Sequence, residues 1–340
     1  MKAIVQHGYG APADVLELED VAEPSVGDGE VLVRVHAASV NVADWHLVRG
    51  EPYVARLDIG LRGPKHSVPG CDLAGRVEAI GRKVTSVEPG DEVFGSPFGN
   101  GFGAFAESCL LVSEDLVAPK PATLTFEQAA AVPLAGMTAL QALRDHGQIE
   151  PGQQVLIVGA SGGVGTFAVE IAKSMGAEVT GVCGARNVDM VRSLGADHVI
   201  DYTQDDFAEG GQRYDVILQA AGSRPPGDCR RALTARGTLV SISGESDGHW
   251  IGPLGRAIKA LVIFRFASQR LAIFTVKPNK EDLGSLNELI EAGKVMPTID
   301  RTYSLGEAGE AIAYLEDGHA RGKVVLTVRA RSDGARPSDR

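Results

Sequence analysis

Hydrophobic residues in the first third of the chain come in short runs that are separated by turn-forming residues. Residues 31–35 form such a run, and glycine and proline recur between the runs. The sequence Pro89-Gly90-Asp91 is a tight turn that leads into another strand. Short strands between frequent turns predict a compact, barrel-like β domain over residues 1–122.

From about residue 123 the pattern changes to strands that alternate with helices. Thr125 and Gln128 have the spacing of a capping box at the start of a helix. Residues 154–158 are apolar on both faces, as buried parallel strands are, and the next helix has an apolar face from Val164 to Met175. We also expect a helix near 138–143 and strands at 178–183, 199–200, 215–218 and 238–242. This alternation predicts a doubly wound parallel α/β sheet over residues 123–276.

The segment after residue 276 is too short for a domain of its own. A chain of 340 residues suggests about two domains, at roughly 100–200 residues each. The segment predicts helices near 281–292 and 307–316 and a final strand at 323–328. We therefore expect residues 277–330 to pack back on the first domain and complete it, and the polar tail 331–340 to be disordered.

Charge and cysteine content narrow the class of protein. The formal net charge is −11, which argues against a nucleic-acid partner. The four cysteines stand apart with no C-x-x-C pair, which indicates a reduced, cytoplasmic protein. The first residues begin a strand pattern and show no signal segment, and the most apolar stretch, 251–276, is broken by arginine and lysine. We therefore expect no membrane partner.

A glycine-rich turn, Gly159-Ala-Ser-Gly-Gly-Val-Gly165, lies between the buried strand and the amphipathic helix. Gly159 permits the tight turn, and Gly165 permits close packing of helix on strand. Gly162 and Gly163 let the backbone approach a pyrophosphate, and the helix N-terminus offers it free N–H groups. The predicted dinucleotide site therefore comprises Gly159, Ala160, Ser161, Gly162, Gly163 and Val164.

The residues after the second strand of this domain indicate which dinucleotide binds. An NAD site usually has Asp or Glu there for the ribose 2′-hydroxyl, but this chain has Gly184. Arg186 could pair with a 2′-phosphate, and Tyr202 could reach the same edge. The alternatives are an ordinary surface arginine and a tyrosine that only packs. Together these residues favour NADPH over NADH.

Several motifs, in this order, carry a resemblance to a known family. In the first third they are Ser39-Val-Asn-Val-Ala-Asp44 and Pro69-Gly-Cys-Asp-Leu-Ala-Gly-Arg-Val77; later come the glycine turn, Leu194-Gly-Ala-Asp-His-Val-Ile-Asp-Tyr202, Phe274-Thr-Val-Lys-Pro-Asn279 and Gly318-His-Ala-Arg-Gly-Lys-Val-Val-Leu326. The chain resembles the medium-chain dehydrogenase/reductase superfamily, in its zinc-free quinone oxidoreductase-like branch. The resemblance implies a GroES-like β-rich barrel for substrate, a Rossmann domain for NADPH and a cleft between them. It also implies cofactor contacts at Thr138, Phe274 and Val276, and a homodimer joined through Rossmann edge strands at 271–276.

The resemblance also bears on metal binding. Aligned with zinc-dependent members, the three catalytic ligand positions fall on Asn41, on Cys71 and near Leu134. Only Cys71 could ligate, and a zinc site needs three or four ligands. His36, His46 and His66 lie nearby in sequence without a tight ligand spacing, so we expect no metal.

Without a Lewis acid, hydride must go to an acceptor that is already electrophilic, such as a quinone or an α,β-unsaturated carbonyl. Asn41 is the candidate to hydrogen-bond the substrate carbonyl or hold the nicotinamide ribose, and Tyr53 the candidate to protonate or bind an enolate. Asp44 is a third candidate, and its alternative role is to cap a helix. The alternative for Thr138 is an ordinary position in the interior of a helix. The cleft walls could include Trp45, Tyr53, Phe98 and Trp250, with residues 244–256 as a lid or wall.

Three functions remain open from the sequence. The first is an NADPH-dependent quinone reductase acting on a small electrophilic carbonyl or quinone. The second is an enal or enone reductase that acts on C=C. The third, of another class, is a catalytically idle NADPH-binding sensor or crystallin-like protein.

Overall fold

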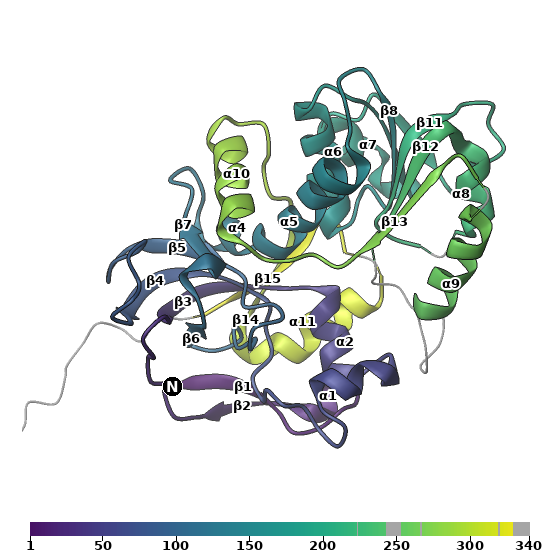
Figure 1. Ribbon diagram of the computed structural model, residues 1–340. Coiled ribbons are helices and arrows are strands. Elements are labelled where there is room, and N and C mark those ends of the chain that lie inside the picture. Colours follow the sequence, from purple (N-terminus) through teal and green to yellow (C-terminus); the bar gives the residue numbers. More distant parts are fainter. Residues whose placement is uncertain (223, 243–252, 266, 319, 329–340) are drawn as a thin grey trace, which may run out of the picture.

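A β-rich domain and an α/β domain lie side by side, with the C-terminal segment passing between them (Figure 1). The computed structural model describes residues 1–222, 224–242, 253–265, 267–318 and 320–328. The predicted tail 331–340 and the wall residue Trp250 lie outside the described residues. The predicted fold class, a Rossmann sheet plus a GroES-like barrel, is confirmed.

The β-rich domain is built on a sheet with the described strand order β14-β15-β3-β4-β5-β7, in which β6 also pairs with β3. A two-stranded hairpin, β1 and β2, lies beside it. The strands are β1 Lys2–Gln6, β2 Leu16–Asp20, β3 Val31–Val40, β4 Asp72–Ile80, β5 Glu92–Gly95, β6 Ser108–Leu111, β7 Val117–Pro119, β14 Ile299–Ser304 and β15 Lys323–Thr327. The helices around this sheet are α1 Pro12–Val15, α2 Val42–Arg49, α3 Arg56–Ile59 and α11 Ala308–Glu316.

The α/β domain has a parallel sheet with the described strand order β10-β9-β8-β11-β12-β13. Its strands are β8 Gln154–Val158, β9 Glu178–Cys183, β10 His198–Asp201, β11 Tyr214–Gln219, β12 Leu233–Ile242 and β13 Arg270–Phe274. Its helices are α5 Pro133–Gln141, α6 Gly163–Ser174, α7 Val188–Ser193, α8 Pro226–Ala232, α9 Pro253–Phe264 and α10 Lys280–Glu291, with a π-helical segment at Ala142–Gly147. Helix α4 Phe126–Ala130 precedes α5 and packs on the β-rich sheet. Apolar side chains fill both faces of the sheet.

Most of the predicted elements are confirmed, some to the residue. Strands β8 and β9 match their predicted bounds, and the capping box of Thr125 and Gln128 opens α4. The two predicted helices after residue 276 are α10 and α11, and the predicted final strand is β15. Within the described residues, β13 is an edge strand of the parallel sheet.

Several elements were not predicted: helices α1, α2, α3, α7, α8 and α9 and strands β2, β6, β7 and β14. Strand β14 has no fully buried residue, and helix α2 buries only Asp44 and Val48, so neither shows the apolar period of a core element. Of the expected lid or wall over residues 244–256, residues 244–252 lie outside the described residues, and the rest begins helix α9 at Pro253, a residue whose fixed φ suits a helix start. No helix within the described ranges is long and apolar enough to cross a bilayer.

The chain segments that connect the two domains position the functional residues. Helix α4 packs on β3 and β4, whereas the following helix α5 packs on α6 of the parallel sheet. Strand β15 pairs antiparallel with β3, and its first residues cross the start of α6. The C-terminal segment therefore lies next to the glycine turn on one side and pairs with the β-rich sheet on the other.

Candidate active site

The glycine turn connects the carboxyl end of β8 to the N-terminus of α6. Gly159 has φ +82°, and a Cβ there would lie 2.4 Å from the Ala221 methyl. A Cβ at Gly165 would lie 2.0 Å from the Gly159 carbonyl oxygen, so this glycine is required for close packing. At Gly162, by contrast, the nearest atom to a Cβ is 3.5 Å away and belongs to the turn itself. This open position beside unpaired helix N–H groups fits a bound pyrophosphate.

The C-terminal segment closes one side of the turn. Gly322 donates its N–H to the Ser161 carbonyl at 2.9 Å and forms an isolated bridge with Gly162. A Cβ at Gly163 would lie 3.1 Å from Cδ of Lys323. Gly163 therefore faces the stem of a lysine, and a larger residue there would crowd it. Ala160 is buried in the core, and Val164 is partly buried.

Gly184, Arg186 and Tyr202 are brought together at the ends of β9 and β10. A Cβ at Gly184 would lie 3.3 Å from the Tyr202 hydroxyl oxygen, and the Tyr202 ring is 61% exposed. Arg186 is exposed in the short helical turn that follows Gly184. Asn187 is buried and donates from Nδ2 to Ser161 Oγ at 3.0 Å, which links this loop to the glycine turn.

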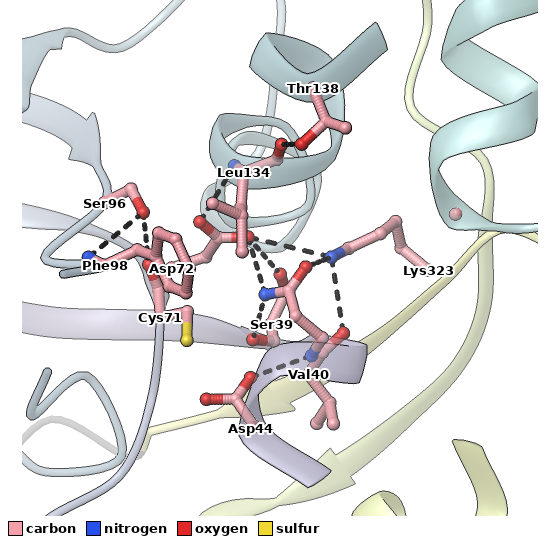
Figure 2. Close-up of polar contacts among 12 residues, drawn as sticks. Ser39, Val40, Asp44, Cys71, Asp72, Ser96, Phe98, Leu134, Thr138 and Lys323 are labelled. Carbon is pink, nitrogen blue, oxygen red and sulfur yellow. Dashed lines mark hydrogen bonds and ion pairs between the residues drawn. The ribbon is translucent and has the colours of Figure 1, made fainter. Parts of the chain in front are cut away.

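A buried polar cluster occupies the substrate-domain side, at the junction of β3, β4, α5 and β15 (Figure 2). The Asp72 carboxylate is fully buried and accepts from Ser39 Oγ at 3.0 Å, from Asn41 Nδ2 at 2.9 Å and from the Leu134 N–H at 2.9 Å. The Lys323 ammonium lies 3.6 Å from the same carboxylate. Burial raises the pKa of Asp72, and the Lys323 charge opposes that rise.

The Asn41 side chain is held on both sides by this cluster. Its Nδ2 donates to Asp72 and, at 3.3 Å, to the Ser39 carbonyl, while its Oδ1 accepts from Lys323 Nζ at 2.5 Å. Both amide hydrogens are therefore used within the chain. The expected role as a donor to the substrate carbonyl requires one of these bonds to be exchanged.

Asp44 caps helix α2, which is the alternative role that the sequence offered for it. Its Oδ2 accepts the Asn41 N–H at 2.8 Å, and the residue is fully buried. Burial raises the pKa of this carboxyl from 3.8 to about 7. Burial also raises the pKa of the neighbouring Cys71 thiol well above its usual value. Burial therefore favours the protonated form of Asp44.

The other candidate residues lie apart from this cluster or in packing roles. The Tyr53 ring contacts the Arg56 guanidinium at 4.5 Å. The Thr138 hydroxyl donates to the Leu134 carbonyl at 2.6 Å, within its own helix. Phe274 stacks on His146 at the end of β13, and Val276 packs against the core.

Two of the expected wall residues, Trp45 and Phe98, contact other apolar side chains of their own domain. Trp45 packs against the barrel core, whereas Phe98 meets Phe102 edge-on at 6.1 Å. Phe102 also borders a small hollow that has room for little more than one water. This hollow is lined by Gln6, Tyr9, Leu47, Ile59, Pro64, His66, Val68, Pro69 and Phe102.

Comparison with known proteins agrees with this arrangement. A family model for the alcohol dehydrogenase GroES-like domain matches residues 27–133, and one described as zinc-binding dehydrogenase matches residues 194–326. Quinone-oxidoreductase QR1, chloroplastic, from Triphysaria versicolor is 36% identical over 96% of this chain and 98% of its own length. NADPH-dependent alkenal/one oxidoreductase, chloroplastic, from Arabidopsis thaliana is 33% identical over 96% of this chain and 79% of its own.

Solved structures give the same result. The quinone oxidoreductase from Coxiella burnetii has a TM-score of 0.85 at 32% identity, covering 97% of this chain and 99% of that one. The Escherichia coli quinone oxidoreductase complexed with NADPH has a TM-score of 0.81 at 28% identity, covering 96% and 100%.

The chain belongs to the medium-chain dehydrogenase/reductase superfamily. Its place is in the quinone oxidoreductase-like branch, as the resemblance predicted, and it is an oxidoreductase. The non-enzymatic alternative is therefore set aside.

Because one matching model of this superfamily is described as zinc-binding, we tested the donor atoms against a zinc site. Asn41 presents an amide already bonded to Lys323, Cys71 a buried thiol with a raised pKa, and Leu134 only a backbone N–H that Asp72 accepts. This donor set does not fit zinc, which needs three or four ligands. Within the described ranges, the one group of three potential ligands within 4.8 Å of one another is His7, Glu17 and Glu19, on the β1–β2 hairpin.

Sequence reasoning assigned no role to Asp72 or Lys323. Both stand inside motifs that carried the resemblance, Asp72 after Cys71 and Lys323 after Gly322. A charged residue inside an apolar strand is a signal that could have drawn attention to each, because unpaired charges are rarely buried.

Proposed function

We propose that this oxidoreductase uses NADPH to transfer hydride, without zinc, to a quinone-type acceptor. The observation that carries the cofactor choice is the end of β9, where Gly184 stands in place of a carboxylate and Tyr202 and Arg186 flank it. A cationic side chain beside an aromatic hydroxyl suits a 2′-phosphate better than a ribose 2′-hydroxyl.

Asp201, one residue before Tyr202, is the acid that could argue for NADH. Its carboxylate instead accepts from the Thr203 N–H at 3.0 Å, from Thr203 Oγ1 at 2.9 Å and from Gln204 Nε2 at 3.1 Å. The Thr203 backbone bond in particular holds the pKa of Asp201 below its usual value. This acid therefore stabilises its own turn and leaves the NADPH proposal standing.

The cofactor would be held by the glycine turn and the N-terminus of α6, with Thr138, Phe274 and Val276 proposed along its nicotinamide half. When bound, it supplies a hydride, so that a quinone, NADPH and one proton give a hydroquinone and NADP⁺. The chain's own part is to orient the acceptor and to keep charge fixed around it. The donor set at Asn41 and Cys71 supports an acceptor that needs no Lewis acid.

A second candidate is reduction of the C=C bond of an enal or enone. The relative named as an alkenal/one oxidoreductase favours it, at 33% identity over 96% of this chain. A panel of ortho-quinones, para-quinones, alkenals and enones, followed by NADPH absorbance, separates the two. Turnover of quinones with alkenals inert is the expected result, and the reverse pattern would select the second candidate. Metal analysis of the active protein should find no stoichiometric zinc.

The cofactor choice has its own test in Arg186→Ala. The Kd for NADPH should rise about tenfold or more, because a charge-assisted bond is lost, while that for NADH stays within about twofold. Arg192→Ala is the matched control, since Arg192 is exposed on the adjoining helix α7 and pairs with Asp189 at 3.6 Å. Tighter binding of NADH than NADPH by the unmodified protein would overturn the proposal.

We further propose a homodimer joined through β13 and a cytoplasmic location. The edge position of β13 and the exposed Ile273 on it support the first. Four cysteines that are all buried and unpaired support the second.

A further inference from the structure

Lys323 belongs to the polar cluster and also lies beside the glycine turn. The stem runs beside the turn, because a Cβ built at Gly163 would lie 3.1 Å from Cδ of Lys323 and the preceding residue, Gly322, bridges Gly162. From there the side chain crosses to the substrate domain, where Nζ meets Asn41 Oδ1 at 2.5 Å and the Val40 carbonyl at 3.3 Å (Figure 2). One side chain therefore spans the two walls of the site.

The charge at the end of this side chain is fully enclosed. Only 3% of the Lys323 side chain is exposed, and none of the Asp72 side chain is. The ammonium donates to Asn41 Oδ1 and to the Val40 carbonyl, and it forms an ion pair with the Asp72 carboxylate at 3.6 Å. A buried ammonium with its hydrogen bonds and counter-charge in place is fixed in position, because any displacement would leave a charge unpaired.

The Lys323 ammonium connects the elements that surround the site. Asp72 also accepts the Leu134 N–H at the start of α5, and Asn41 begins α2, so the network joins α2, α5, β15 and the turn. Asn41 Nδ2 is bonded to Asp72 and its Oδ1 to Lys323, so the amide cannot rotate without breaking both contacts.

We propose that Lys323 is a positioning residue for hydride transfer. It keeps the Asn41 side chain at a fixed distance from the glycine turn. This inference rests on the proposed NADPH-dependent function. Hydride transfer needs the reacting carbons close and aligned, and a misplacement of about 1 Å can cost about 100-fold in rate. Loss of the network should therefore lower kcat far more than it weakens cofactor binding.

The test is the double variant Lys323→Met/Asp72→Asn, which removes both buried charges together and keeps the side-chain volumes similar. We expect kcat to fall about tenfold or more while the Kd for NADPH rises less than about threefold. The emission of bound NADPH should also shift toward that of free NADPH, because the nicotinamide loses its fixed wall.

Lys120→Met/Glu92→Gln is the matched control for a purely structural lysine. Lys120 is 6% exposed and pairs with Glu92 at 3.3 Å, and its Nζ also donates to the carbonyls of Pro121 and Leu124 and lies 5.5 Å from the centre of the Phe126 ring. This control should lower Tm without changing kcat or the bound NADPH emission. If both double variants lose activity only in proportion to the unfolded fraction, Lys323 is structural and the proposal is overturned.

Two further outcomes are decisive. If the double variant does not fold, Asp72→Asn alone keeps the ammonium with Asn41 and Val40, and it should still lower kcat about fivefold or more; unchanged kcat would overturn the proposal. If the unmodified protein turns over no acceptor, the proposed function fails. The emission of bound NADPH then decides the role of Lys323, and an unaltered emission in the double variant rejects it.

Discussion

The substitution Gly162→Ala tests the cofactor cradle without touching the protein's own packing. A Cβ at Gly162 meets nothing closer than 3.5 Å, and its φ of −86° is open to any residue. Alanine is a poorer N-cap than glycine by about 1 kcal/mol at most, and it gains about 0.4–1 kcal/mol from a less flexible unfolded chain. The free energy of unfolding should therefore change by less than about 1 kcal/mol, which is a shift of about 2–4 °C or less in Tm.

Cofactor binding should respond very differently. A phosphate oxygen that accepts from the α6 N–H groups must come within about 3 Å of them, where the new methyl group lies. Losing one such charge-assisted bond costs about 1.5–3 kcal/mol, so the Kd for NADPH should rise tenfold or more. Fluorescence titration measures the Kd, and thermal unfolding followed by circular dichroism measures Tm.

The control is Gly29→Ala, where a Cβ also has nothing within 4 Å but lies in the turn between β2 and β3. It should leave both Kd and Tm unchanged. Unaltered NADPH binding by Gly162→Ala would refute the cradle at this turn. A Tm loss well beyond 4 °C would instead refute the reading of Gly162 as an open position.

Two other predictions concern pH dependence and assembly. The pKa of Asp44 is about 7 in the folded protein, against 3.8 for an ordinary aspartate. Protonation of Asp44 therefore stabilises the folded state fully below about pH 4, and this stabilisation, at most about 4 kcal/mol, is lost as the pH rises through 7. Asp44→Asn should therefore make the decline in Tm between pH 4 and 8 less steep. Part of the decline should remain, because burial also raises the pKa of Glu170 to about 7. An unchanged dependence of Tm on pH would mean that Asp44 does not titrate in this range. Ile273→Glu on the β13 edge should convert a dimer to a monomer in light scattering, whereas Leu18→Glu on the hairpin should not, and a monomeric unmodified protein would rule out the dimer.

The sequence by itself determined the parts of this protein that local patterns encode. The apolar run of β8, the capping box of α4 and the glycines at 159 and 165 each follow from residues that are neighbours in the chain. Their physical causes act within a turn or a strand, so the Rossmann domain and its dinucleotide turn were predictable. The edge position of β13 was expected from the family resemblance.

Only the tertiary structure decided which side chains meet in the site. Lys323 and Asn41 are 282 residues apart, and no period or turn signal links them. Their contact exists because β15 pairs with β3 and carries Lys323 past the glycine turn. Likewise, Asn41 looked like a free donor in the sequence, whereas the structure commits both its amide hydrogens to Asp72 and Ser39. Burial removes water as a partner, so each polar group here is defined by distant residues that only folding brings within hydrogen-bonding distance.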